Sequence, residues 1–108
     1  MLKQNVTQYF ETLSNLLLSM EVTDNLGASL SLEAGAEQAV QMVLDVKSVS
    51  GKVLLAGNGG SSAIVSHVQN DLCKTVAVRA MTFTEQPLLT ALANDEGYGS
   101  VFEWPIGL

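Results

Sequence analysis

The chain has 108 residues, 47% of them hydrophobic, and its 11 acidic and 5 basic residues give a formal net charge of −6. That length is typical of about one domain, and the apolar content excludes an intrinsically disordered chain. The negative charge argues against nucleic-acid and membrane-surface binding, although backbone amides can still bind an anionic small molecule.

Two helices are expected in the first half of the chain. Apolar residues recur at three- and four-residue intervals over residues 2–20, in a stripe broad enough to bury more than one face. Residues 23–31 contain turn residues and are expected to form a linker, with Ser31 as the N-cap of the second helix and Gly51 as its stop signal. The side chains of the second helix that are expected to point inward are Leu32, Ala36, Ala39, Val40, Met42, Val43 and Val46.

Strands and helices alternate in the second half. The run KVLLAG, residues 52–57, predicts a buried parallel strand, and residues 75–83 predict a second strand. Helices are expected over residues 62–73 and 86–95. This order predicts an α/β fold with a parallel sheet. Two strands are few for a doubly wound sheet, so we expect the chain to be the front portion of a larger domain.

A glycine-rich turn follows the first predicted strand. Its residues are Asn58, Gly59, Gly60, Ser61 and Ser62. At this place in α/β sheets, loop amides and a helix N-terminus present partial positive charge to anions, and glycines allow close approach of a ligand. The sequence fits neither a dinucleotide fingerprint nor a P-loop. The alternative interpretation is a tight turn between two buried elements.

Candidate chemical groups follow in the next predicted helix. His67, the only histidine, and Asp71 are four residues apart and share one helix face, which suits a metal-ligand pair or an acid–base couple. A solvated His–Asp contact is the alternative. Cys73 is expected to be a small core residue off that face. Asn94 and Asp95, by themselves, are compatible with a helix C-cap and turn.

The sequence also predicts a cellular compartment. The single cysteine cannot form an internal disulfide, and we find neither a signal-peptide pattern nor an apolar run long enough to span a bilayer. We therefore expect a cytoplasmic protein.

Two motifs in the second half carry a family resemblance. They are VLLAGNGGSSAIVSH, with a histidine nine residues after the asparagine, and LLTALANDEGYGSVF, with an N-D-x-G-Y segment. Their order resembles the sugar isomerase (SIS) domain family, and within it the phosphoheptose isomerase group, over nearly the whole chain. The resemblance implies an incomplete flavodoxin-like fold of three αβα layers. Residues 1–50 would be an N-terminal helical hairpin for oligomerisation, and residues 51–108 the first part of the SIS α/β domain.

The resemblance also implies an activity. Members interconvert sedoheptulose 7-phosphate and D-glycero-D-manno-heptose 7-phosphate, on the way to the heptose of bacterial lipopolysaccharide. A proton moves between adjacent carbons through an enediolate, which needs a base and an electrophile, and zinc can supply the electrophile. By position, His67 would be a zinc ligand. Asp71 stands where the family has a glutamate and would contact metal and substrate and act as the candidate base.

The remaining implied roles concern the substrate and the assembly. The residues that would contact the sugar phosphate are Asn58, Gly59, Gly60, Ser61, Asp71, Asn94 and Asp95. The family's second phosphate loop and its C-terminal Gln and His would lie beyond Leu108, so we expect the 108-residue chain alone to be inactive. A homotetramer or homodimer is implied, with the N-terminal helices between subunits; alternatively, these helices cover their own sheet.

A second class of function remains open at this point. A SIS relative can keep the fold without catalysis, and sense a sugar phosphate or bind a protein, as the replication-initiator-binding relatives do. A remnant without any activity is a weaker third hypothesis. The presence of His67 and Asp71 together with the N-D-x-G-Y segment favours the isomerase.

Overall fold

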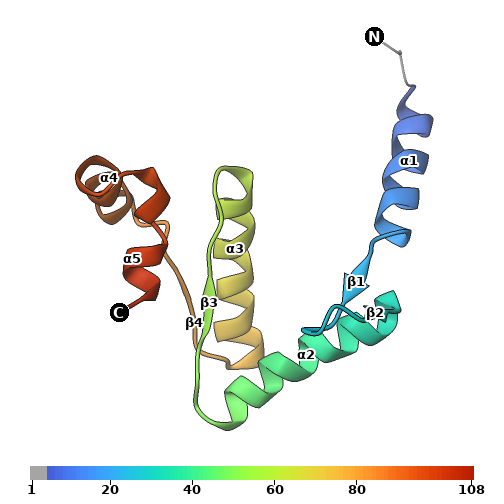
Figure 1. Cartoon of the computed structure of the whole chain (residues 1–108), viewed down its shortest axis with the longest axis horizontal. Helices are drawn as coiled ribbons and strands as arrows, with labels where there is room; N and C mark the ends of the chain where they lie inside the picture. Colours follow the sequence, from blue (N-terminus) through green and yellow to red (C-terminus); the bar gives the residue numbers. More distant parts are fainter. Residues whose placement is uncertain (1–4) are drawn as a thin grey trace. The chain divides into compact units, whose positions relative to one another are not determined.

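The computed structural model of the chain describes residues 5–108 and divides into two compact units, Met1–Gln41 and Met42–Leu108 (Figure 1). Residues 2–4 of the first predicted helix lie outside the described residues. The assignment of residues 1–50 as an oligomerisation hairpin stays a prediction. In the described part of the chain, no helix has both the length and the apolar content needed to cross a membrane.

The first unit opens with helix α1, Val6–Leu18, whose start is set by a capping box. The Asn5 side chain accepts a hydrogen bond from the backbone N–H of Gln8 (2.8 Å), and the Gln8 side chain accepts one from the backbone N–H of Asn5 (3.2 Å). The predicted helix is therefore confirmed over these residues. Its apolar side chains are exposed, Phe10 by 61% and Leu16 by 64%.

A short hairpin follows α1 where a plain linker was predicted, so that prediction was wrong. Strand β1, Val22–Thr23, pairs antiparallel with β2, Ser29–Leu30. The turn between them is held by Asp24, whose side chain accepts hydrogen bonds from the backbone N–H groups of Leu26 (2.8 Å) and Ala28 (2.9 Å). Strands of two residues are too short to leave an alternating pattern in the sequence.

Helix α2, Leu32–Ser48, begins as predicted, because the Ser31 hydroxyl accepts a hydrogen bond from the backbone N–H of Ala34 at 3.1 Å. Of the side chains expected to point inward, Leu32, Val43 and Val46 are half-buried, but the expectation was wrong for Ala36, Ala39, Val40 and Met42, which are exposed. Val40 is 60% exposed and Met42 is 68% exposed. Helical periodicity identified the apolar face, but it could not show whether this chain supplies a surface to cover that face.

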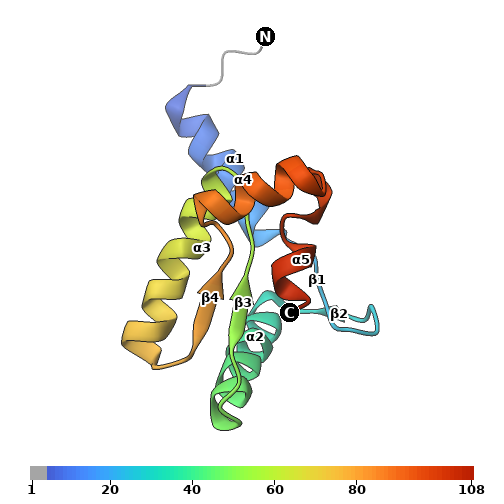
Figure 2. The same ribbon diagram turned by 90° about the vertical axis from the view of Figure 1, so that its left-hand side faces the viewer.

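The second unit contains a parallel pair of strands, which confirms an α/β fold with a parallel sheet. Strand β3, Val53–Leu55, pairs with β4, Ala80–Thr82, in the register Val53↔Ala80 and Leu55↔Thr82. Helix α3, Gly60–Asp71, connects the strands and packs against both of them (Figure 2). β3 is not the buried strand that was predicted: Leu54 is 40% exposed, whereas Val53 and Leu55, on the opposite face of the strand, are half-buried.

The second strand is shorter than the predicted range 75–83. A π-helix, η1, continues α3 over Leu72–Val76 and occupies the start of that range. It ends at Ala77, which has a left-handed backbone with φ of +55°. The β-branched residues at this point favour a strand by propensity, but the continuing helix overrides that preference.

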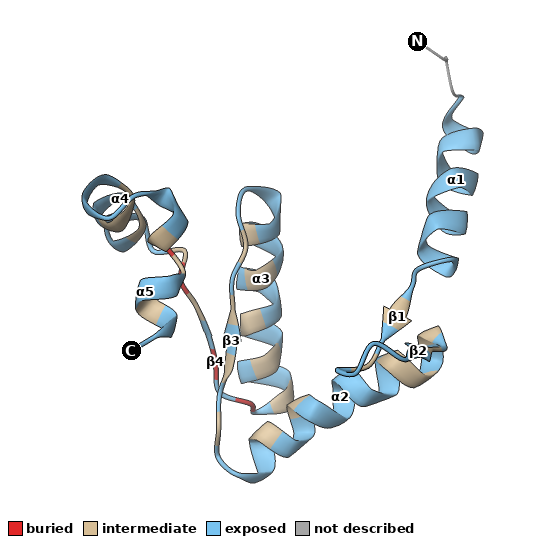
Figure 3. Ribbon diagram, in the orientation of Figure 1, coloured by how far each residue is buried: buried red, intermediate tan, exposed pale blue. Residues whose placement is uncertain are grey.

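Three short helical segments complete the unit. Helix α4, Gln86–Asp95, matches its predicted range and has proline in its first turn; η2, Tyr98–Ser100, and α5, Glu103–Ile106, follow. The buried residues of the described part of the chain lie in and on either side of β4 (red in Figure 3), and one of them directly follows η2. They are Val78, Ala80, Phe83 and Val101.

Two helices end close together near the starts of β3 and β4, and each ends in a left-handed residue. At the end of α2, Ser50 has φ of +54°, and the backbone N–H of Gly51 donates to the carbonyl of Val46 at 2.8 Å. This is the Schellman arrangement, so the stop comes from Ser50 together with the predicted Gly51. At the end of η1, Ala77 takes the same role, with its N–H bonded to the Leu72 carbonyl.

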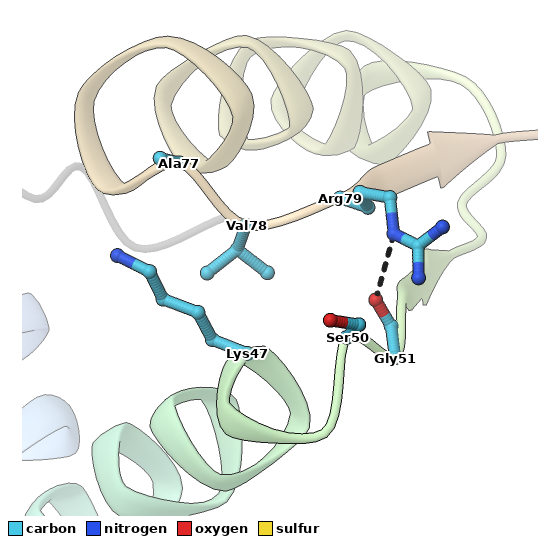
Figure 4. A pocket seen from close by; sticks show the side chains of 6 residues that line it. All are labelled: Lys47, Ser50, Gly51, Ala77, Val78 and Arg79. Carbon is cyan, nitrogen blue, oxygen red and sulfur yellow. Dashed lines mark hydrogen bonds between the residues drawn. The ribbon is translucent and has the colours of Figure 1, made fainter.

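A cleft of about 300 Å³ lies between these two helix ends (Figure 4). Lys47 Nζ donates to the Val76 carbonyl at 2.6 Å, and Arg79 Nε donates to the Gly51 carbonyl at 3.3 Å. Helix C-termini carry partial negative charge and unpaired carbonyls, which cations stabilise. The two basic residues of this cleft are therefore explained by the ends of the helices that they contact.

Candidate functional site

The glycine-rich segment after β3 forms a tight turn that starts α3. Gly59 has φ of +56° and ψ of −125°, the values of the second residue in a type II′ turn. The backbone N–H of Ser61 donates to the Asn58 carbonyl at 3.0 Å and closes the turn. A non-glycine residue rarely adopts this conformation, so Gly59 is required by the backbone itself.

Gly57 is required for a different reason. A Cβ at this position would lie 2.8 Å from both the backbone carbon and the carbonyl oxygen of Ser61. The turn therefore folds back onto the end of β3 closely enough to leave no room for a side chain. Sequence reasoning did not single out this glycine, although its place directly after the strand is a recognisable signal.

The turn is open to solvent, which argues against the alternative of a turn sealed between buried elements. Asn58, Gly59, Gly60 and Ser61 are all exposed. The N–H groups of Ser61 and Ser62 are taken by bonds to the carbonyls of Asn58 and Gly59, both at 3.0 Å. An anion at this helix start would therefore be bound by the glycine N–H groups and the serine hydroxyls.

His67 and Asp71 lie together on one exposed face of α3, as predicted from their spacing. Nε2 of His67 is 3.6 Å from Oδ2 of Asp71, and the side chains are 77% and 56% exposed. Tetrahedral zinc with ligand bonds of 2.0–2.1 Å holds two donor atoms about 3.3 Å apart, so this pair fits as two ligands of one ion.

Gln69 sets the direction of that pair. Its Nε2 donates to the Ala80 carbonyl at 3.2 Å, and its Oε1 accepts from the Thr82 hydroxyl at 2.9 Å, which ties α3 to β4. A residue two positions from both His67 and Asp71 lies on the opposite side of an α-helix. The pair therefore points away from β4.

The N-D-x-G-Y segment reaches the turn through its tyrosine. The Tyr98 hydroxyl donates a hydrogen bond to Oδ1 of Asn58 at 2.7 Å. Asn94 Nδ2 donates to Oδ1 of Asp95 at 2.8 Å, so these two predicted sugar contacts hold each other at the end of α4. The sequence places Tyr98 in the motif, but no role was predicted for it from the sequence.

The predicted residues thus form two groups. The turn and the N-D-x-G-Y segment are brought together by the bond from Tyr98. No hydrogen bond or ion pair within residues 5–108 links His67 or Asp71 to that group. From the helical rise, His67 lies about 10 Å along α3 from Gly60.

The described residues do not form a complete metal site. Among residues 5–108, no group of three or more His, Cys, Asp and Glu side chains is placed to hold a metal ion. Cys73 is exposed, so its prediction as a core residue was wrong; Sγ lies 3.7 Å from the Ala80 carbonyl. The described residues therefore offer one neighbouring pair of possible donors, His67 and Asp71, whereas a zinc site needs three or four protein ligands.

Several known proteins are similar to this chain. It is 32% identical over 87 residues to a phosphoheptose isomerase of Akkermansia muciniphila, a match that covers 75% of this chain and 46% of the relative. The chain belongs to the phosphoheptose isomerase group. It is also 33% identical to the Helicobacter pylori enzyme, over 67% of this chain and 41% of that enzyme. The phosphoheptose isomerase of Aneurinibacillus thermoaerophilus is 31% identical, over 82% of this chain and 48% of the relative.

These matches cover only part of each relative. The chain spans about half the length of the curated phosphoheptose isomerases it matches. No protein-family model and no solved structure matches the chain. Membership of the group therefore rests on sequence similarity to these enzymes.

Proposed function

We propose that the protein containing this chain is a sugar-phosphate isomerase that interconverts sedoheptulose 7-phosphate and D-glycero-D-manno-heptose 7-phosphate. The observation that carries this proposal is the similarity to phosphoheptose isomerases over 67–82% of the chain. The open turn at the start of α3 supports it, because an exposed helix N-terminus after a parallel strand suits an anionic sugar phosphate.

In this proposal the turn binds the substrate. The N–H groups of Gly59 and Gly60 and the Ser61 hydroxyl bind the phosphate, and Asn58 contacts it through its side-chain amide. Asn94 and Asp95 contact sugar hydroxyls. Exposure of all these residues supports their availability to a ligand.

The proton transfer is assigned to Asp71. Its carboxylate takes the proton beside the substrate carbonyl and returns it to the adjacent carbon, through an enediolate. Zinc bound by His67 and Asp71 would supply the electrophile that stabilises the oxyanion. The distance of 3.6 Å between their donor atoms supports the pairing.

The site needs residues that the described chain does not bring to it. His67 and Asp71 are open to solvent, and zinc needs one or two further protein ligands. We propose that the chain is part of a flavodoxin-like SIS domain. The further ligands would come from the remainder of that domain and from a second copy of the chain, in a homodimer or homotetramer. The exposed apolar face of α1 supports self-association, since large exposed apolar patches mark interaction sites. A cytoplasmic location is part of the same proposal.

The experiment is an isomerase assay on the full-length protein with sedoheptulose 7-phosphate, with and without added zinc. We expect turnover, and a loss of at least about 100-fold in kcat for Asp71→Asn, because the amide cannot accept the proton. Glu33→Gln, on the first turn of α2, is the matched carboxylate-to-amide control and should retain activity. Absence of turnover under both conditions would overturn the proposal, and binding without turnover would indicate a non-catalytic sugar-phosphate sensor.

A further inference from the structure

The hydrogen bond from Tyr98 to Asn58 joins distant segments of the second unit, and the proposed function has not yet used it. The phenolic O–H donates to Oδ1 of Asn58 at 2.7 Å, between residues 40 positions apart in the sequence. Its length is typical of a good O–H···O hydrogen bond. It joins η2 to the turn at the start of α3.

The segment that carries Tyr98 is firmly placed. Gly97, with φ of +87°, precedes η2, and its carbonyl accepts a hydrogen bond from the backbone N–H of Ser100 at 3.1 Å. The next residue, Val101, is 2% exposed and is among the buried side chains of the unit. Tyr98 is 54% exposed, so its ring lies at the surface, while the nearby Val101 anchors this segment in the core.

The bond decides which end of the Asn58 carboxamide faces outward. A carboxamide has one acceptor oxygen and an NH₂ group with two donors. Because Oδ1 accepts from Tyr98, the Nδ2 donors are left to face another partner. Asn58 is exposed beside the Gly59 and Gly60 amides, so this orientation adds two N–H donors to the same turn. Donors are what an anionic phosphate or a sugar hydroxyl oxygen needs.

We propose that Tyr98 is a positioning residue of the sugar-phosphate site, which acts by fixing the Asn58 side chain with its Nδ2 donors toward the substrate. The inference rests on the proposed function. The tyrosine of the N-D-x-G-Y segment then acts on the glycine-rich turn at Asn58. The two motifs are therefore parts of one binding site.

The test is a double-mutant cycle on the full-length protein. Tyr98→Phe removes only the hydroxyl, and Tyr9→Phe on α1 makes the same change at a tyrosine remote in sequence from the turn. We expect Tyr98→Phe to raise KM and the calorimetric Kd for sedoheptulose 7-phosphate about 3- to 10-fold, with kcat within about twofold. In the Asn58→Ala background, Tyr98→Phe should change Kd by less than about 1.5-fold, because its partner is gone.

A ligand-free measurement separates this inference from the proposed function. In protein labelled with ¹⁵N-asparagine, Tyr98→Phe should shift the side-chain NH₂ signals of Asn58, and Tyr9→Phe should not. Unchanged Asn58 signals would overturn the inference, as would an equal effect of Tyr98→Phe on Kd with and without Asn58. If the wild-type protein neither binds nor converts the sugar phosphate, the proposed function fails, and the positioning role at that site fails with it even where the signals shift.

Discussion

The Thr82 hydroxyl of β4 donates a hydrogen bond of 2.9 Å to the side-chain oxygen of Gln69 in α3. With the bond from Gln69 Nε2 to the Ala80 carbonyl, it fixes the rotation of α3 against the sheet. That rotation turns the face carrying His67 and Asp71 outward. A partly buried glutamine thus determines where the two candidate metal ligands point.

Replacement of Gln69 tests this role. Gln69→Ala removes both bonds and leaves the Ala80 carbonyl and the Thr82 hydroxyl without these partners. We expect the free energy of unfolding to fall by about 1–3 kcal/mol, measured by urea denaturation followed by circular dichroism. Gln38→Ala on the exposed surface of α2 is the control and should stay within about 0.5 kcal/mol. An equal effect of both variants would contradict the role of Gln69.

The glycine at the end of β3 gives a second prediction. Gly57→Ala places a Cβ against the Ser61 backbone, which cannot move without opening the turn. We expect a loss of about 1–3 kcal/mol in stability. Gly60→Ala has no atom within 4 Å of the added Cβ and lies at the start of α3, so it should be neutral or stabilising. Equal stability of the two variants would show that the turn is looser than described.

Ala77, the left-handed residue after η1, gives a prediction of increased stability. Ala77 has φ of +55°, where an L-residue is strained and glycine is not. Ala77→Gly is therefore expected to raise the unfolding free energy by about 0.5–1 kcal/mol. The same substitution at Ala63, within α3, should lower it by about 1 kcal/mol. Thermal denaturation of both variants checks the signs; a loss of stability in Ala77→Gly would contradict the assignment.

The length of the carboxylate at position 71 gives a functional prediction. The family resemblance implies a glutamate at the position of Asp71, and the two side chains are carboxylates that differ by one methylene. We expect Asp71→Glu in the full-length protein to keep kcat/KM for sedoheptulose 7-phosphate within about 100-fold of wild type, since displacement of a catalytic group by about 1 Å costs on the order of 100-fold. A loss as large as that of Asp71→Asn would show that the longer carboxylate cannot replace Asp71 and would contradict this expectation.

Periodicity and capping residues allowed the helices to be predicted well. The range of α4 matches, and Ser31 caps α2 as expected. The β1–β2 hairpin and η1 could not be predicted, because strands of two residues and a π-turn leave no periodic pattern. The exposure of Met42 and Cys73 was predicted wrongly. The sequence shows that a residue is apolar, but it does not show whether this chain or another surface buries it.

The candidate site was predictable in its local parts. Spacing alone placed His67 and Asp71 on one face, and the glycine pattern placed the turn after a strand. The link from Tyr98 to Asn58 joins segments 40 residues apart, and the direction of α3 depends on Gln69, so both needed three-dimensional information.

The Asn58–Ser61 turn is the proposed binding site for the phosphate of a sugar phosphate. A crystal structure of the full-length protein with sedoheptulose 7-phosphate bound tests it most directly. We expect phosphate oxygens about 2.7–3.2 Å from the backbone nitrogens of Gly59 and Gly60 and from the Ser61 hydroxyl. A bound substrate whose phosphate lies elsewhere, with this turn contacting only water, would contradict the claim.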